Sequence, residues 1–215
     1  MGQRKLSKRG GQHVMAGALQ VVVMMGVLCC ALVFSGCGRK TEEPVTQTTL
    51  TIGADGRVQY EIVESFDQSY YDVEELARLS EEAVAAYNMK NGGERVQLVR
   101  TEVTDGMLHM VLDFDSASDF SHFGFVSLTY DTVDGVRQNG QTVPSGLIDA
   151  KGETVSTAEL MVEEANRHII ISQEPAQLRT PYKIRYHSAD TELTSSHIAT
   201  PAEDTTLPIV LILDK

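Results

Sequence analysis

Apolar and polar residues alternate over short stretches from residue 48 onward, which is the pattern of strands buried on one face. Residues 48–52 and 58–62 alternate on either side of a turn at Gly53–Gly56 and predict a β-hairpin. Residues 96–114 predict a second hairpin, with its turn at Asp105-Gly106. The same pattern predicts four further strands, at 125–130, 167–172, 182–188 and 207–213.

Helical periodicity replaces this alternation after Asp72. Asp72 and Glu75 form a capping box, and Asn91-Gly92-Gly93 ends the helix. The apolar residues between them recur at helical spacing and are expected to face the core: Val73, Leu76, Leu79, Ala83 and Tyr87.

Two shorter helices are predicted further along the chain. Ser116 with Asp119 caps one over 117–123, and Ser156 begins another that runs to about Asn166. Residues 131–146 are rich in Gly, Asn and Gln and are predicted to form a long loop, which is functional or mobile. Together these elements predict an α+β fold, with mostly antiparallel strands and two or three helices.

The first 36 residues have the parts of a secretory signal. Residues 2–13 are polar and basic, 14–34 are almost unbroken apolar or small residues, and small residues precede a cleavage position. Because the positive flank stays in the cytoplasm, the rest of the chain is expected to be exported.

The end of this signal, Phe34-Ser35-Gly36-Cys37, resembles the lipobox of bacterial lipoproteins, although Phe34 stands where that family prefers Leu. The resemblance implies that a diacylglyceryl group is attached to the Cys37 sulfur and that a peptidase cleaves between Gly36 and Cys37. Two acyl chains anchor a protein stably to the membrane. An uncleaved membrane-spanning helix over 14–34 is the alternative, because 21 residues at about 1.5 Å each cross about 30 Å of bilayer.

These observations predict three parts. Residues 1–36 form the lipoprotein signal peptide, and 37–47 form the lipidated cysteine and a flexible tether. Residues 48–215 form the extracytoplasmic domain, which is either single or divided into subdomains 48–130 and 147–215.

Charge and cysteine usage narrow the functions further. The chain has 18 Lys+Arg and 30 Asp+Glu, and the first 37 residues hold four of the basic side chains and no acidic one, so the remainder carries 14 − 30 = −16. Such an acidic body repels phosphate backbones, so nucleic-acid binding is not expected. All three cysteines lie within the first 37 residues, so a domain lipidated at Cys37 has no disulfide and depends on its apolar core.

Parts of the globular region resemble small uncharacterised lipoproteins of Gram-positive anaerobes. The resemblance rests on Tyr71–Leu76, Tyr87–Gly92 and Asp115–Phe120 and covers roughly residues 48–125. It implies no activity.

No motif predicts a catalytic site, a cofactor or a metal. Asp113–Asp119 lacks the Gly and Glu positions of a calcium loop and is interpreted as a strand end and helix cap, with weak calcium binding as the alternative. Ser145 lacks the nucleophile-elbow pattern, and no glycine-rich phosphate motif is present. The histidines of the body have no zinc-type spacing: His109, His122, His168, His187 and His197. Paired glutamates are interpreted as solvated helix faces: Glu74/Glu75, Glu81/Glu82 and Glu163/Glu164.

Tyrosines offer a weaker indication of binding. A stacking surface for a glycan is one interpretation of four of them: Tyr70, Tyr71, Tyr182 and Tyr186. Packing is the alternative for most of them, and Tyr60 and Tyr87 occupy core-facing positions.

Three functions fit these observations. The preferred one is a non-catalytic binding or structural module, lipid-anchored on the outer face of the cytoplasmic membrane, with an envelope protein or a glycan as partner. A transporter-associated solute-binding lipoprotein is the second, although such proteins usually have two lobes around a cleft. An envelope hydrolase whose residues meet only in the fold is the third.

Overall fold

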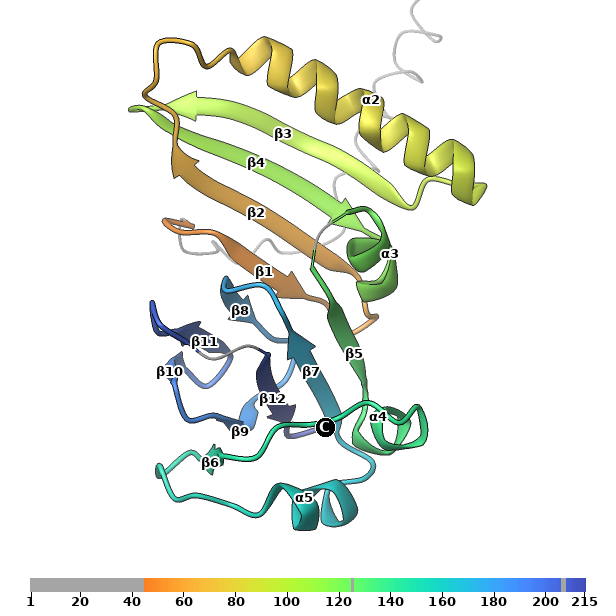
Figure 1. The fold of residues 1–215 in the computed structure, drawn as a ribbon, viewed down its shortest axis with the longest axis vertical. Coiled ribbons are helices and arrows are strands. Elements are labelled where there is room, and N and C mark those ends of the chain that lie inside the picture. Colours follow the sequence, from red (N-terminus) through yellow and green to blue (C-terminus); the bar gives the residue numbers. More distant parts are fainter. Residues whose placement is uncertain (1–44, 125, 206–207) are drawn as a thin grey trace, which may run out of the picture. The chain divides into compact units, whose positions relative to one another are not determined.

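Two β-sheets and four helices make up the described part of the computed structural model, which comprises residues 45–124, 126–205 and 208–215 (Figure 1). Residues 45–215 form one compact unit. The α+β prediction, with mostly antiparallel strands, is confirmed. The predicted signal peptide (1–36), the predicted lipidation and cleavage site at Cys37, and the predicted tether up to residue 44 lie outside the described residues.

The larger sheet has seven strands. Their order is β10 (Thr191–Ser195), β11 (Ile198–Pro201), β8 (Gln177–Arg179), β1 (Thr49–Ile52), β2 (Val58–Ser65), β4 (Met107–Phe114) and β3 (Val96–Thr104). All neighbours are antiparallel except β1 and β8, which are parallel. Both predicted hairpins are confirmed, and Asp105 and Gly106 both have positive φ, as a tight two-residue hairpin turn requires.

The smaller sheet has five antiparallel strands. Their order is β5 (Leu128–Thr132), β7 (His168–Ser172), β12 (Ile209–Leu213), β9 (Ile184–Ser188) and β6 (Leu147–Asp149). Segments 48–130 and 147–215 both contribute strands to each sheet.

The apolar core lies on both faces of the smaller sheet. Ile209, Leu211 and Leu213 of β12 belong to a cluster shared with the larger sheet, and Val210 and Ile212 belong to a second cluster. Alternate side chains of a strand point to opposite faces, so a strand buried on both faces is apolar throughout. Every residue of β12 is accordingly buried.

The helices are α2 (Val73–Asn91), α3 (Ala117–His122), α4 (Val133–Gln138) and α5 (Thr157–Glu163). The predicted caps are confirmed: Asp72, Ser116 and Ser156 accept hydrogen bonds from backbone N–H groups of the first turns. Gly92 ends α2 in the left-handed conformation. Helix α5 ends at Glu163, three residues before the predicted end.

The prediction of a loop over 131–146 is wrong for its first half. Strand β5 continues to Thr132, and α4 follows it directly. The Thr132 hydroxyl accepts a hydrogen bond of 3.0 Å from the Gly135 N–H, and Val133 and Val136, three residues apart, are buried in the second cluster. A six-residue helix with two buried apolar residues is too short for its periodicity to stand out in the sequence.

Candidate interaction surface

Exposed apolar side chains gather on one part of the molecule. Among the described residues, eight large apolar side chains are exposed, and six of them belong to α2, the segment before it and β3: Tyr70, Tyr71, Leu79, Met89, Val99 and Val103. Contiguous exposed apolar area on a soluble domain marks an interaction site. We call the area formed by Tyr70, Tyr71, Leu79, Val99 and Val103 the α2–β3 surface.

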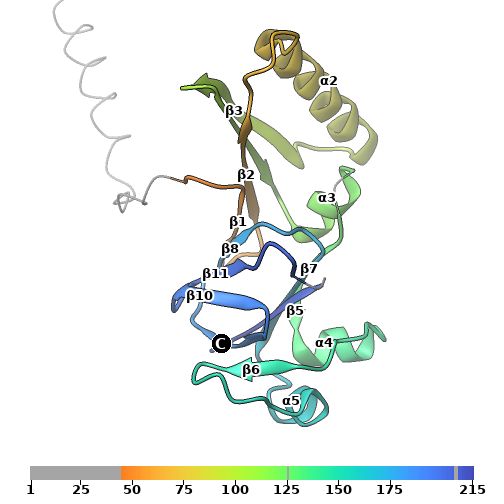
Figure 2. The ribbon, with the colours of Figure 1, turned by 60° about the vertical axis from the view of Figure 1, so that its left-hand side comes forward.

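Helix α2 covers its sheet only in part, although it is the longest helix of the described chain. It runs along β3 and β4 (Figures 1 and 2), and none of its 19 residues is buried. Leu76 and Tyr87 contact the core as predicted, and Val84, which was not predicted to do so, contacts it as well. The predicted core residue Val73 is half-buried. The prediction that Leu79 and Ala83 also face the core is wrong, because Leu79 is 49% exposed and Ala83 is exposed.

Strand β3 is the last strand of the larger sheet, so one of its edges has no strand neighbour in the described chain. The Asn88 side chain closes the start of this edge by accepting from the Val96 N–H (3.0 Å) and donating to the Val96 carbonyl (2.7 Å). A β-bulge lies between Leu98 and Arg100. Val99, the extra residue of this bulge, is 50% exposed, and Val103, beyond it, is 36% exposed.

Charged side chains cross from this edge to the neighbouring strands. Arg100 contacts Glu102 on its own strand at 3.2 Å and donates to Glu61 of β2 at 2.8 Å. His109 of β4 lies 3.6 Å from the same Glu61 carboxylate. The His109 side chain is 23% exposed.

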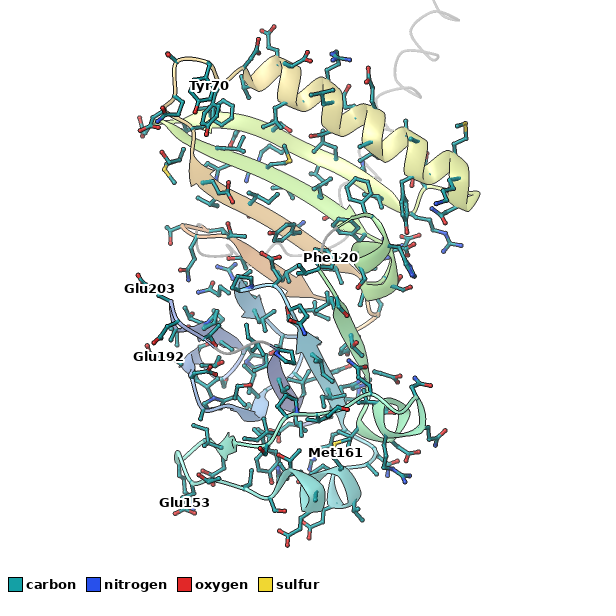
Figure 3. The ribbon with its side chains drawn as sticks, in the orientation of Figure 1. Tyr70, Phe120, Glu153, Met161, Glu192 and Glu203 are labelled. Carbon is teal, nitrogen blue, oxygen red and sulfur yellow. The ribbon has the colours of Figure 1, made fainter. Side chains whose placement is uncertain are left out.

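An aromatic cluster lies just before α2. The Phe66 and Tyr71 ring centroids are 4.7 Å apart, and those of Tyr70 and Tyr71 are 4.9 Å apart in an edge-to-face arrangement. Tyr70 is 76% exposed and lies beside the start of α2 (Figure 3). Tyr70, by its charge and hydrogen bond, is the main cause of the raised pKa of Tyr71, and Asp67 and Glu64 add to it.

The four tyrosines of the predicted stacking surface do not all meet. Tyr70 and Tyr71 are together, but Tyr186 donates to Glu164 at 3.2 Å and Tyr182 belongs to a different stack. In that stack His168 lies between Tyr130 and Tyr182, with centroids at 5.0 and 5.6 Å. The Tyr130 hydroxyl and His168 Nδ1 are buried without a hydrogen-bond partner among the described residues. Tyr60 is buried, and Tyr87 contacts the core, as predicted.

A shallow cleft lies between α4, the segment after it and α5. Its volume is about 470 Å³, and its lining includes Arg137, Gln141, Ser145, Thr157 and Met161. Arg137 forms an ion pair with Asp134, which lowers the pKa of that carboxyl. Figure 3 shows Met161 on α5. The cleft is thus formed partly by residues 131–146, the segment predicted as a long loop. Its lining combines the Arg137 cation with the hydroxyl groups of Ser145 and Thr157.

The other candidate residues are dispersed. Asp113–Asp119 is a strand end followed by a cap, as predicted, with β4 ending at Phe114 and Ser116 capping α3. His187 and His197 contact Ser188 and Ser196 through their Nδ1 atoms. Within the described residues no group of three or more His, Cys, Asp or Glu side chains could hold a metal ion.

Nothing in the sequence singled out β3 as an edge. The available signal was its pair of charged residues, Arg100 and Glu102, because natural edge strands commonly carry charge. Pairs of oppositely charged residues also occur on strands inside a sheet. Only the strand order therefore identifies β3 as an edge strand.

The predicted membrane attachment concerns the part of the chain before Val45. In the described residues, no helix has the length and apolarity needed to cross a bilayer. The predicted lipid-attachment residue Cys37 and the predicted cleavage position after Gly36 lie outside those residues. No protein-family model, curated protein or solved structure matches the chain.

Proposed function

We propose that this protein is a lipoprotein of the bacterial cell envelope, held on the outer face of the cytoplasmic membrane by acyl chains on Cys37. Its globular body acts as a non-catalytic binding module, and the α2–β3 surface is where the partner binds. The partner is a protein or a glycan of the envelope.

The anchor is supported by the order of residues before the globular body. A basic segment, a 21-residue apolar run and the Phe34-Ser35-Gly36-Cys37 sequence follow one another, and about ten polar residues separate Cys37 from β1. The body beyond Cys37 holds no cysteine. Thioether formation at Cys37 therefore removes the last thiol of the mature chain.

The binding role is supported by the distribution of exposed apolar side chains. Five of the eight such side chains in the described residues form the α2–β3 surface, and this observation carries the proposal. Leu79 occupies a position whose spacing is that of a core residue, yet it is half exposed. A partner that covers this surface would complete its burial.

Metabolic labelling tests the anchor. Cells that express the full chain receive a clickable fatty acid, and the wild type is compared with Cys37→Ala and with Cys30→Ala as a matched control. We expect label on the wild type and on Cys30→Ala and none on Cys37→Ala. Equal labelling of all three variants would contradict lipidation at Cys37.

Cross-linking in native membranes tests the binding surface. The yield of cross-linked partner is compared between the wild type, Leu79→Ser and Val162→Ser, the last being a 72%-exposed apolar residue on α5. We expect a several-fold lower yield for Leu79→Ser and the wild-type yield for Val162→Ser. Equal yields for both variants would place the partner elsewhere.

The α4–α5 cleft favours a second candidate, a solute-binding lipoprotein. Its 470 Å³ volume is within the range of small-molecule sites, and Arg137 would attract an anionic solute. A screen of anionic solutes should then raise the melting temperature of the wild type but not of Arg137→Ala. If no solute raises the melting temperature, the solute-binding candidate is refuted and only the binding-module proposal remains.

A further inference from the structure

The α2–β3 surface contains a strand edge that is complementary to itself. We propose that β3 pairs antiparallel with β3 of a second copy of this chain, in the register that places Thr101 opposite Thr101 of the second copy. The inference rests on the proposed function, because it names the partner that the α2–β3 surface binds.

The edge is available only over a limited length. No described strand pairs with the outer edge of β3, and an edge strand presents a row of backbone donors and acceptors. Asn88 already binds the backbone of Val96, and the bulge after Leu98 interrupts the regular strand. The regular segment after the bulge, 100–104, is long enough for one short ladder. Because each copy has one such edge, self-pairing closes as a two-fold dimer.

The charges on this segment select the register. With Thr101 on the two-fold axis, Arg100 of each copy lies opposite Glu102 of the other. The two symmetric registers on either side would place Arg100 opposite Arg100 or Glu102 opposite Glu102. Opposite charges across a strand pair stabilise it and like charges destabilise it, so the first register is favoured.

The exposed apolar residues agree with the same register. The bulge residue Val99 of each copy then lies nearest Val103 of the other, which brings together the two exposed valines of β3. Pairing of this kind keeps both α2 helices on the same face of the joined sheet, side by side. Leu79 and Ala83 are exposed although they have the spacing of core residues, and both lie on α2. In the dimer, α2 of the second copy would lie beside this helix.

Reciprocal charge reversal tests the pairing. Two full-length versions of the chain, each with a different carboxy-terminal tag, are expressed together and extracted in mild detergent, and one tag is used to capture the other. We expect wild-type copies to co-purify. Arg100→Glu in both copies, or Glu102→Arg in both copies, should reduce recovery at least tenfold, since like charges then face each other twice.

The mixed pair gives the decisive comparison. A copy with Arg100→Glu and a copy with Glu102→Arg present opposite charges at both contacts, so recovery should return towards the wild-type level. Arg78→Glu makes the same charge change on α2, where Arg78 contacts Glu75 and Glu82, and should leave recovery unchanged. Melting curves check that each variant is folded. Arg100→Glu removes the ion pair between Arg100 and Glu61 within one copy, whereas Glu102→Arg leaves that ion pair in place.

Two results would overturn the proposal. One is failure of wild-type copies to co-purify, and the other is a mixed pair that recovers no better than the single variants. Neither result depends on the anchor, because the membrane is dissolved. Loss of fatty-acid labelling would instead refute lipidation and leave the pairing intact.

Discussion

The Tyr60 hydroxyl donates a hydrogen bond of 2.9 Å to Glu174 Oε1, which joins β2 to the segment after β7. Burial is the main cause of the raised pKa of Tyr60, and the charge of Glu174 adds to it. Burial also raises the pKa of Glu174, and this outweighs the opposite effect of the Tyr60 hydrogen bond. The folded protein therefore binds the Glu174 proton more tightly than the unfolded chain does.

Glu174→Gln should change how stability depends on pH. A carboxyl whose pKa is raised by folding stabilises the native state below its unfolded pKa, and this contribution is lost as pH rises through the folded value. The neutral Gln keeps an acceptor for Tyr60 without that loss. Denaturant titrations should therefore show Glu174→Gln gaining stability relative to the wild type as the pH rises above the ordinary range of a carboxyl pKa. The exposed Glu203→Gln should show no such gain, and an equal gain in both would contradict the assignment.

Removal of the donor has the opposite effect. Tyr60→Phe leaves a partly buried carboxylate without this hydrogen bond, which should cost about 1–3 kcal/mol of unfolding free energy at pH 7. Combining it with Glu174→Gln should not restore the wild-type value, because the Gln would also lack its donor. Urea unfolding of the single and double variants measures both effects. A loss below about 0.5 kcal/mol would show that the contact is not stabilising.

Strand β12 should tolerate truncation poorly on either face. Leu211 and Ile212 are fully buried in different clusters, so Leu211→Ala and Ile212→Ala should each cost about 2–5 kcal/mol. Val162→Ala, at a 72%-exposed position, should stay within about 0.5 kcal/mol of the wild type. Urea midpoints provide the comparison. A small effect at either β12 position would contradict burial on both faces.

Much of the fold can be predicted from local sequence patterns, and the elements that the sequence did not predict were missed for physical reasons. Asp72, Ser116 and Ser156 identified three helix starts because capping requires particular side chains at fixed spacing. Four strands were missed: β6, β8, β10 and β11. Each has three to five residues, and β10 is largely polar and exposed, so alternation could not reveal it.

The strand ends were less predictable than the strands. The expected strand at 125–130 was placed too early, because β5 is fixed by its pairing with β7, where Leu128 lies opposite Ser172. That long-range pairing leaves no trace in the local sequence. The edge position of β3 is hidden for the same reason, so the α2–β3 surface could be found only from the structure.

Helix α4 follows β5 where the sequence predicted a loop, and its cap can be tested by substitution. Thr132→Ala removes the oxygen that accepts from the Gly135 N–H, so it should cost about 1 kcal/mol. Thr142→Ala, at an exposed position after α4, should cost much less. Chemical denaturation measures the difference. Equal effects would show that Thr132 does not cap a helix.

The most direct measurement is the mass of the amino-terminal peptide of the mature protein, purified from its native membrane. The account predicts a chain that begins at Cys37 and carries a diacylglyceryl group on its sulfur. A peptide that continues through Gly36 and holds an unmodified Cys37 thiol would contradict it.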